Sequence, residues 1–331
     1  MKRHDWIDIA KGIGILLVIL AHTRFATSGI SHWINSFHMP LFFLMAGLCY
    51  DENRYPTYWS YFKRKCGALL YPYVTLSLLV IALMSVLYLG NEPNFSSYSL
   101  LCNMCKGGTI GAFWFIWVLL EVELCYAILA RCAFRMGERL LLCALCGIVA
   151  VSLAGKHLPY LLDIMMLALP FYGVGHCMRK VMIKPNRMMV MILLLLGFVH
   201  LIIVKFAFPY SACFAANSLF VPYLFFVLAF AGSFFISGLS MLIERIGSCR
   251  GGVIVKNLLT FLGKNSIILL ATHNALGICR ASWCTHFPEV GAFWFQLIEI
   301  GVLLMLLFLL SGPLNCLIRI QMTRRSSDML N

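Results

Sequence analysis

Long apolar runs follow one another along nearly the whole chain, and they limit the possible folds more than any other feature. An α-helix needs roughly 20 residues to cross the hydrocarbon core of a bilayer. The runs lie at 7–25, 37–50, 67–89, 112–130, 140–154, 161–178, 188–206, 219–243, 258–279 and 293–317. We therefore predict an all-α, polytopic membrane protein of about ten transmembrane helices. These helices are expected to form a single membrane domain over residues 1–331.

The composition and the distribution of charge agree with this class. Hydrophobic residues make up 61% of the chain and charged residues 12%, which excludes an ordinary soluble protein. The net charge of +13 would elsewhere indicate nucleic acid, but the basic residues form short clusters between the apolar runs, so we expect no nucleic-acid partner. If each run crosses the membrane once, 19 of the 26 lysines and arginines lie on the same side as the N-terminus. This bias predicts that both termini lie in the cytoplasm. The expected location is the cytoplasmic (inner) membrane.

The 14 cysteines do not indicate a metal site. Most of them lie inside apolar runs, where cysteine behaves as a small hydrophobic residue. Cys102 with Cys105 and Cys143 with Cys146 form C-x-x-C pairs, but neither pair is accompanied by further ligands at the spacing that zinc requires. We predict that the protein binds no metal.

Ionisable residues inside apolar runs are functional candidates because each is costly where it faces lipid. Lys11 and His22 are eleven residues apart in the first run. At about 100° per residue this spacing places them within roughly 20° of one face, some 16 Å apart along the helix. Asp8 precedes Lys11 by three residues and can pair with it. Alternatively, Lys11 reaches the inner headgroups and His22 only caps the helix.

Other candidates lie further along the chain. His38 begins the segment HMPLFFLMAG and either binds substrate or bonds a backbone carbonyl at the turn around the following proline. Glu121 and Glu123 lie about 200° apart on one helix, so they cannot face the same cavity. The aromatic residues before them are more typical of a membrane interface than of a ligand cage. His176 and His200 have no polar neighbours in the sequence and are interpreted as satisfied interior or edge histidines.

The segment FLGKNSIILLATH contains the other concentration of polar residues. Lys264, Asn265 and Ser266 directly follow Gly263, and His273 comes two turns later. This pattern predicts a break in the ninth helix. Irregular backbone at membrane depth survives only where it lines a wet cavity or is buried in protein, so a water-filled site is expected here.

Five segments, taken together and in this order, resemble one known family. They are WIDIAKGIGILLVILAH, FHMPLFFLMAG, FKRKCGALLYPY, WFIWVLLEVEL and FLGKNSIILLATH. The chain resembles the acyltransferase-3 family of integral-membrane O-acyltransferases, and the likeness extends from the first helix to about residue 280. The resemblance implies an enzyme that uses a cytoplasmic acyl-CoA, usually acetyl-CoA, as co-substrate. It also implies an acceptor hydroxyl on an extracytoplasmic carbohydrate or glycolipid of the cell envelope.

The family's first-helix signature is an arginine, ten residues and then the histidine regarded as catalytic. His22 occupies the histidine position and Lys11 the arginine position. Lysine keeps the charge but not the bidentate fork of arginine. The family's R-x-x-R motif on the first cytoplasmic loop is imperfect here, because Arg64 and Lys65 are present but Ala68 stands where a second basic residue is expected.

Acyl transfer from a thioester to an alcohol needs a base, and His22 is the predicted general base because a neutral imidazole has a suitable pKa. Asn265 and Ser266 are predicted donors to the developing oxyanion. His38 and His273 are assigned to the acceptor side or to a proton relay.

The donor phosphates are expected to meet cytoplasmic cations, namely Arg54, Lys63, Arg64 and Lys65. Lys11 is expected deeper, along the thioester arm. Glu123 is predicted to pair with one of the histidines. Because His22 lies about 24 Å beyond Trp6 along the first helix, the donor arm must extend through a pore among the helices.

Two other functions fit the same residues. A proton-coupled transporter or flippase for a polar or lipid-linked solute would also use membrane histidines and carboxylates, as proton carriers. A membrane scaffold without chemistry would leave the ionisable residues unexplained. Release of free CoA from an acyl-CoA separates the enzyme from both.

Overall fold

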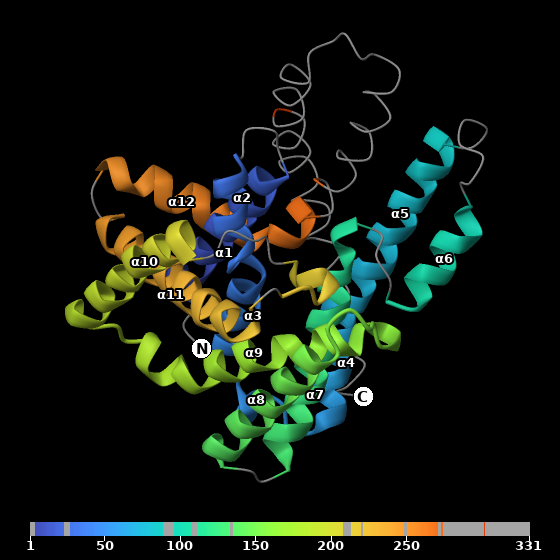
Figure 1. Cartoon of the computed structure of the whole chain (residues 1–331), viewed down its shortest axis with the longest axis horizontal. Helices are drawn as coiled ribbons and strands as arrows, with labels where there is room; N and C mark the ends of the chain where they lie inside the picture. Colours follow the sequence, from blue (N-terminus) through green and yellow to red (C-terminus); the bar gives the residue numbers. More distant parts are fainter. Residues whose placement is uncertain are drawn as a thin grey trace, which may run out of the picture. The chain divides into compact units, whose positions relative to one another are not determined.

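A computed structural model describes residues 4–22, 27–88, 96–107, 111–132, 135–207, 213–219, 221–247 and 250–270, with residues 273 and 301. Throughout this part of the chain the regular structure is helical, apart from one isolated bridge between Cys213 and Ser218. The predicted all-α class is therefore confirmed for the described residues (Figure 1).

The α-helices, in chain order, are α1 (Asp5–Ala21), α2 (Ser28–Asn35), α3 (His38–Leu48), α4 (Tyr58–Lys65), α5 (Tyr71–Tyr88), α6 (Ser97–Cys105), α7 (Trp114–Arg131), α8 (Met136–Ser152), α9 (Leu162–Met182), α10 (Arg187–Ala207), α11 (Pro222–Ile246) and α12 (Arg250–Lys264). Short turns complete the set: η1 (Glu52–Arg54), η3 (Gly111–Phe113), η4 (Pro159–Leu161) and η5 (Phe214–Ala216), with the π-helical η2 (Cys66–Leu70).

Each of the first eight predicted runs overlaps a helix. The ninth, 258–279, overlaps α12 and then extends beyond the described residues, and the tenth, 293–317, lies outside them apart from residue 301. Within the described part, five helical segments are long and apolar enough to cross a membrane by length and composition. They are Tyr58–Val86, Gly111–Arg131, Pro159–Met182, Arg187–Phe206 and Pro222–Ile246. A membrane protein is thus supported, while ten spans and cytoplasmic termini stay predictions.

The chain divides into two compact units. Unit 1 contains residues 1–54, 125–158 and 162–266, and unit 2 contains residues 55–124, 159–161 and 267–331. Helix α7 contributes its first part to unit 2 and its last part to unit 1. The single membrane domain of the sequence analysis stays a prediction.

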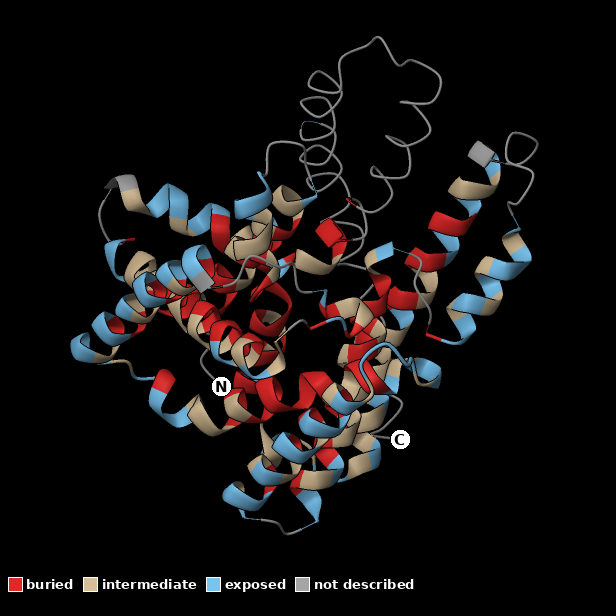
Figure 2. Cartoon of the chain, viewed as in Figure 1, coloured by how far each residue is buried: buried red, intermediate tan, exposed pale blue. Residues whose placement is uncertain are grey.

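Helix α3 forms the centre of unit 1, where it packs against α1, α9 and α11. Its residues are apolar on all sides, and nearly all of them are buried (Figure 2). Two glycines permit the tight contact with α9. A Cβ atom at Gly47 would overlap the Tyr172 carbonyl, and one at Gly175 would overlap the Leu44 carbonyl. The backbones therefore touch, which fixes the position of α3 and of the residues at its two ends.

A second close contact joins α1 and α12. A Cβ atom at Gly12 would overlap the Leu259 carbonyl, and one at Gly263 would overlap the Asp8 carbonyl. The predicted break falls at Asn265, inside the polar run that follows Gly263, because α12 ends at Lys264 and a turn lies at the next residue. The glycine is needed where the two helices cross, since any side chain there would separate them.

Unit 2 is built on one continuous helical segment. Thr57 and Ser60 form a capping box at the start of α4. The helix then passes through η2 into α5, and α6 packs beside α5. A π-helical turn inside a helix changes the angular register of the residues on either side and often marks a functional site. Here it begins directly after Lys65.

Candidate active site

His22 lies at the end of α1 and is exposed. Its Nδ1 atom is 2.8 Å from the carbonyl oxygen of Val18, one turn earlier in the helix. A carbonyl oxygen only accepts hydrogen bonds, so Nδ1 carries the proton in the neutral ring. The basic lone pair of His22 is therefore on Nε2, and the α1 backbone sets this tautomer.

His38 repeats this arrangement at the first residue of α3. Its Nδ1 atom is 2.9 Å from the carbonyl oxygen of Ile34, so its basic lone pair is also on Nε2. Unlike His22, His38 is buried. Both histidines belong to unit 1. We refer to His22 and His38 as the histidine pair.

The predicted partner of Lys11 is in place. Its Nζ atom is 3.8 Å from a carboxylate oxygen of Asp8, whose side chain is 3% exposed. The Lys11 side chain is 26% exposed, so the ammonium keeps access to solvent or headgroups. The pairing keeps charge on one face of α1, as the three-residue spacing predicts.

The predicted oxyanion donors lie at the end of α12, also in unit 1. Asn265 is buried, and its side-chain amide donates a hydrogen bond to the carbonyl of Phe261 at 2.8 Å. Ser266 follows and is half-buried. Of the cations predicted to hold the donor phosphates, Arg54, at the end of η1, belongs to unit 1, and it is exposed.

The buried carboxylate of Glu123 has partners that the sequence analysis did not foresee. It forms an ion pair with Lys65 at 2.7 Å and accepts a hydrogen bond from the hydroxyl of Tyr61. The Lys65 ammonium also lies 5.3 Å from the centre of the Tyr61 ring. Lys63 differs, because it is exposed and lies over the Trp59 ring. The structure thus gives Glu123 a lysine and a tyrosine as partners, where a histidine was predicted.

The remaining candidates of unit 2 are less closely connected. His273 is buried and Arg64 is half-exposed. Glu121 accepts a hydrogen bond from the indole nitrogen of Trp117 at 2.8 Å, which keeps its contacts separate from those of Glu123. This separation agrees with the predicted opposite faces of the two glutamates. Among the described residues, no three His, Cys, Asp or Glu side chains are grouped to hold a metal ion.

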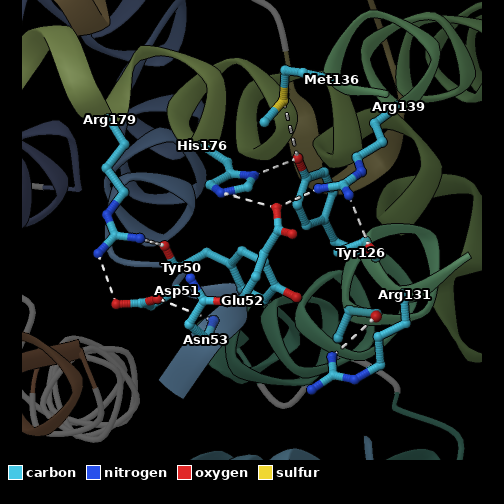
Figure 3. A network of polar contacts seen from close by, with 12 residues as sticks. Tyr50, Asp51, Glu52, Asn53, Tyr126, Arg131, Met136, Arg139, His176 and Arg179 are labelled. Carbon is cyan, nitrogen blue, oxygen red and sulfur yellow. Dashed lines mark hydrogen bonds and ion pairs between the residues drawn. The ribbon is translucent and has the colours of Figure 1, made fainter. Parts of the chain in front are cut away.

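A polar network that sequence analysis missed holds the loop after α3 (Figure 3). Arg179 of α9 donates to the Tyr50 carbonyl at 2.6 Å and pairs with Asp51 at 3.0 Å. The guanidinium of Arg179 lowers the pKa of the Asp51 carboxyl below its ordinary value. The loop is therefore held to the end of α9 by an ion pair and by a hydrogen bond to its backbone.

The neighbouring residue Glu52 continues the network. It forms an ion pair with Arg139 of α8, and its carboxylate is 3.6 Å from Nε2 of His176. The Nδ1 atom of His176 is 2.8 Å from the Tyr126 hydroxyl (Figure 3). Arg139 also donates to the Ala130 carbonyl at 2.9 Å. We call Asp51, Glu52, Arg139, His176 and Arg179 the loop clamp.

The sequence carries only a weak signal for the loop clamp. Its members come from one loop and two helices, so no local spacing connects them. From the sequence, His176 was interpreted as a satisfied histidine. The contacts with Tyr126 and Glu52 agree with that interpretation of His176.

Comparison with known proteins gives one match. A family model described as an acyltransferase domain matches residues 4–316, nearly the whole chain. No curated protein and no solved structure matches. The match includes all five segments that carry the sequence resemblance.

Proposed function

Because the chain belongs to the acyltransferase-3 family, we propose that it transfers an acyl group, most simply acetyl, from a cytoplasmic acyl-CoA to a hydroxyl of an extracytoplasmic acceptor. The acceptor class is a carbohydrate or lipid-linked glycan of the cell envelope. The enzyme works in the cytoplasmic membrane, and acyl-CoA is a co-substrate.

The observation that carries the proposal is the tautomer of His22. Its Nδ1 proton is committed to the Val18 carbonyl, so Nε2 is the nitrogen that can take a proton. The ring is exposed at the end of α1, which suits a base that must meet a substrate. A base of this kind contributes about 10²- to 10⁴-fold to a reaction rate.

One base is enough for this reaction, because the proton that it accepts from the alcohol is later given to the leaving sulfur. Nε2 of His22 accepts the proton of the acceptor hydroxyl while the oxygen attacks the thioester carbonyl carbon. The resulting oxyanion accepts hydrogen bonds, for which Asn265 and Ser266 are the proposed donors. The carbon–sulfur bond then breaks, the ester is released, and the CoA sulfur leaves with the proton from the imidazolium. His38 and His273 serve the acceptor side or relay that proton.

Different cations are proposed for different parts of the donor. Lys63, Arg64 and Arg54 hold its phosphates, because charge-assisted hydrogen bonds to phosphate are strong. Lys65 contributes less, since its ammonium already lies against the Glu123 carboxylate. Lys11 lies further along the path of the thioester arm, with its ammonium paired to Asp8.

The test is CoA release by the purified full chain in detergent. Acetyl-CoA is supplied with an envelope extract from cells that lack the gene, and free CoA is separated by chromatography because 14 cysteines would react with a thiol reagent. We expect CoA release that needs the extract and that His22→Ala abolishes. His4→Ala is the matched control, because His4 precedes the same helix and makes no capping hydrogen bond. Release that persists in His22→Ala, or no release by the wild type, contradicts the proposal.

A further inference from the structure

His200 is a buried histidine that the proposed reaction does not use. It lies on α10 and is fully buried. Three residues from α2 and the turn before α3 surround it within unit 1. Its ring centre is 5.4 Å from that of Phe37 and 6.4 Å from that of Trp33, and its Nε2 atom is 3.0 Å from the hydroxyl of Ser36.

The hydrogen bonds of Ser36 determine the tautomer of His200. The Ser36 hydroxyl has one hydrogen, which it donates to the Trp33 carbonyl at 2.7 Å. It must therefore accept from His200, so the proton of the neutral imidazole is on Nε2. The Nδ1 atom of His200 is then an acceptor with a lone pair. This is the opposite tautomer to that of the histidine pair.

Two polar atoms around Ser36, one on His200 and one on Trp33, are complementary in their hydrogen-bonding character. Within the described residues, neither Nδ1 of His200 nor the indole Nε1–H of Trp33 has a hydrogen-bond partner, although both atoms are buried. Buried polar groups are normally paired, because leaving one unpaired is costly. One atom is an acceptor and the other a donor. The sequence interpretation of His200 as satisfied therefore holds for Nε2 but not for Nδ1.

The chemistry of the two atoms selects the group that would fit. A hydroxyl can donate to Nδ1 and accept from Nε1–H at the same time. A phosphate or carboxylate has no proton for Nδ1, and an ammonium has no lone pair for the indole. A hydrogen bond to an oxygen spans about 2.9 Å, and the centres of the two rings are 6.4 Å apart.

The chain position connects this place with the histidine pair. His22 ends α1 and His38 begins α3, and the segment between them contains both Trp33 and Ser36. That segment is extracytoplasmic in the predicted topology. From these observations we infer that Trp33, Ser36 and His200 form a subsite for a non-reacting hydroxyl of the carbohydrate acceptor. This inference rests on the proposed function, which supplies the acceptor class.

The subsite is tested by sugar binding to the full chain in detergent. The probes are the methyl glycosides of glucose, galactose, mannose and N-acetylglucosamine, and the measurement is the melting temperature, which a ligand of the folded state raises. We expect at least one glycoside to raise the melting temperature of the wild type. Trp33→Phe keeps the ring but removes the N–H donor, and should need roughly fivefold more glycoside for the same rise. Ser36→Ala, which frees the tautomer of His200, should also weaken the response.

Trp59→Phe is the matched control, because Trp59 is an exposed indole on α4, and it should behave as the wild type. A purely structural role would lower the melting temperature of Trp33→Phe without changing its dependence on glycoside. That result, or no rise with any of the four glycosides, overturns the subsite and leaves only an internal water between the two nitrogens.

The measurement does not depend on acyl transfer, so the two proposals fail separately. Glycoside binding that depends on Trp33, without CoA release, supports the subsite and contradicts the proposed function. If CoA is released but Trp33→Phe responds to glycoside as the wild type does, the result supports the proposed function and contradicts the subsite.

Discussion

The histidine pair and the loop clamp use histidine in opposite ways, although both adjoin α3. His38 begins the helix, and Asp51 and Glu52 follow its end. In the histidine pair each ring bonds a carbonyl of its own turn and keeps Nε2 as a basic atom. In the loop clamp, His176 lies between the Tyr126 hydroxyl and the Glu52 carboxylate. A histidine with partners at both nitrogens holds structure together, whereas one whose Nδ1 proton is donated to a carbonyl has its basic lone pair on Nε2.

The largest effect is expected on CoA release, when one histidine of the histidine pair and the histidine of the loop clamp are each replaced by an amide. His22→Asn keeps an amide donor for the Val18 carbonyl but has no basic Nε2. We expect CoA release to fall by about 10²- to 10⁴-fold while the melting temperature is unchanged. His176→Gln should lower the melting temperature and leave turnover within a few-fold of the wild type. Turnover lost equally in both variants would remove the distinction.

A smaller effect is expected from the ion pair between Arg139 and Glu52 in the loop clamp. Arg139→Met leaves Glu52 and the Ala130 carbonyl without their arginine. We expect a loss of about 1–2 kcal/mol in the free energy of unfolding, less than for a fully buried pair, because the Glu52 side chain is 38% exposed. Denaturant unfolding in detergent measures it. Glu52→Gln combined with Arg139→Met should lose less than the two single changes add up to. Strict additivity would show that the pair is not coupled.

The smallest effect concerns Asp51 and its dependence on pH. Arg179 lowers the pKa of Asp51, so the carboxylate stabilises the folded state above the unfolded pKa of about 3.8. That contribution is lost as the pH falls through the lower folded pKa. We expect the wild type to exceed Asp51→Asn in stability by up to about 1 kcal/mol between pH 5 and 7. In an Arg179→Met background the same comparison should show no difference, and a persistent difference would exclude the ion pair as its cause.

Local features of the site could be predicted well. The pairing of Lys11 with Asp8 follows from their three-residue spacing on one helix, and the ion pair is present. Helix positions also followed from the apolar runs, because hydrophobic length is read directly from the chain. The packing role of Gly263 could not be predicted, since a Cβ atom there would overlap the Asp8 carbonyl of another helix.

The sequence by itself determined the helical membrane class, the family and the choice of His22, because these depend on composition, period and motifs within one helix. Only the tertiary structure decided the partners of Glu123, Glu52 and His200. Their contacts include hydrogen bonds that join residues 62, 87 and 164 positions apart. The physical reason is that a buried polar group must bond whatever the packing of other helices brings to it, and no periodicity along one helix encodes that neighbour.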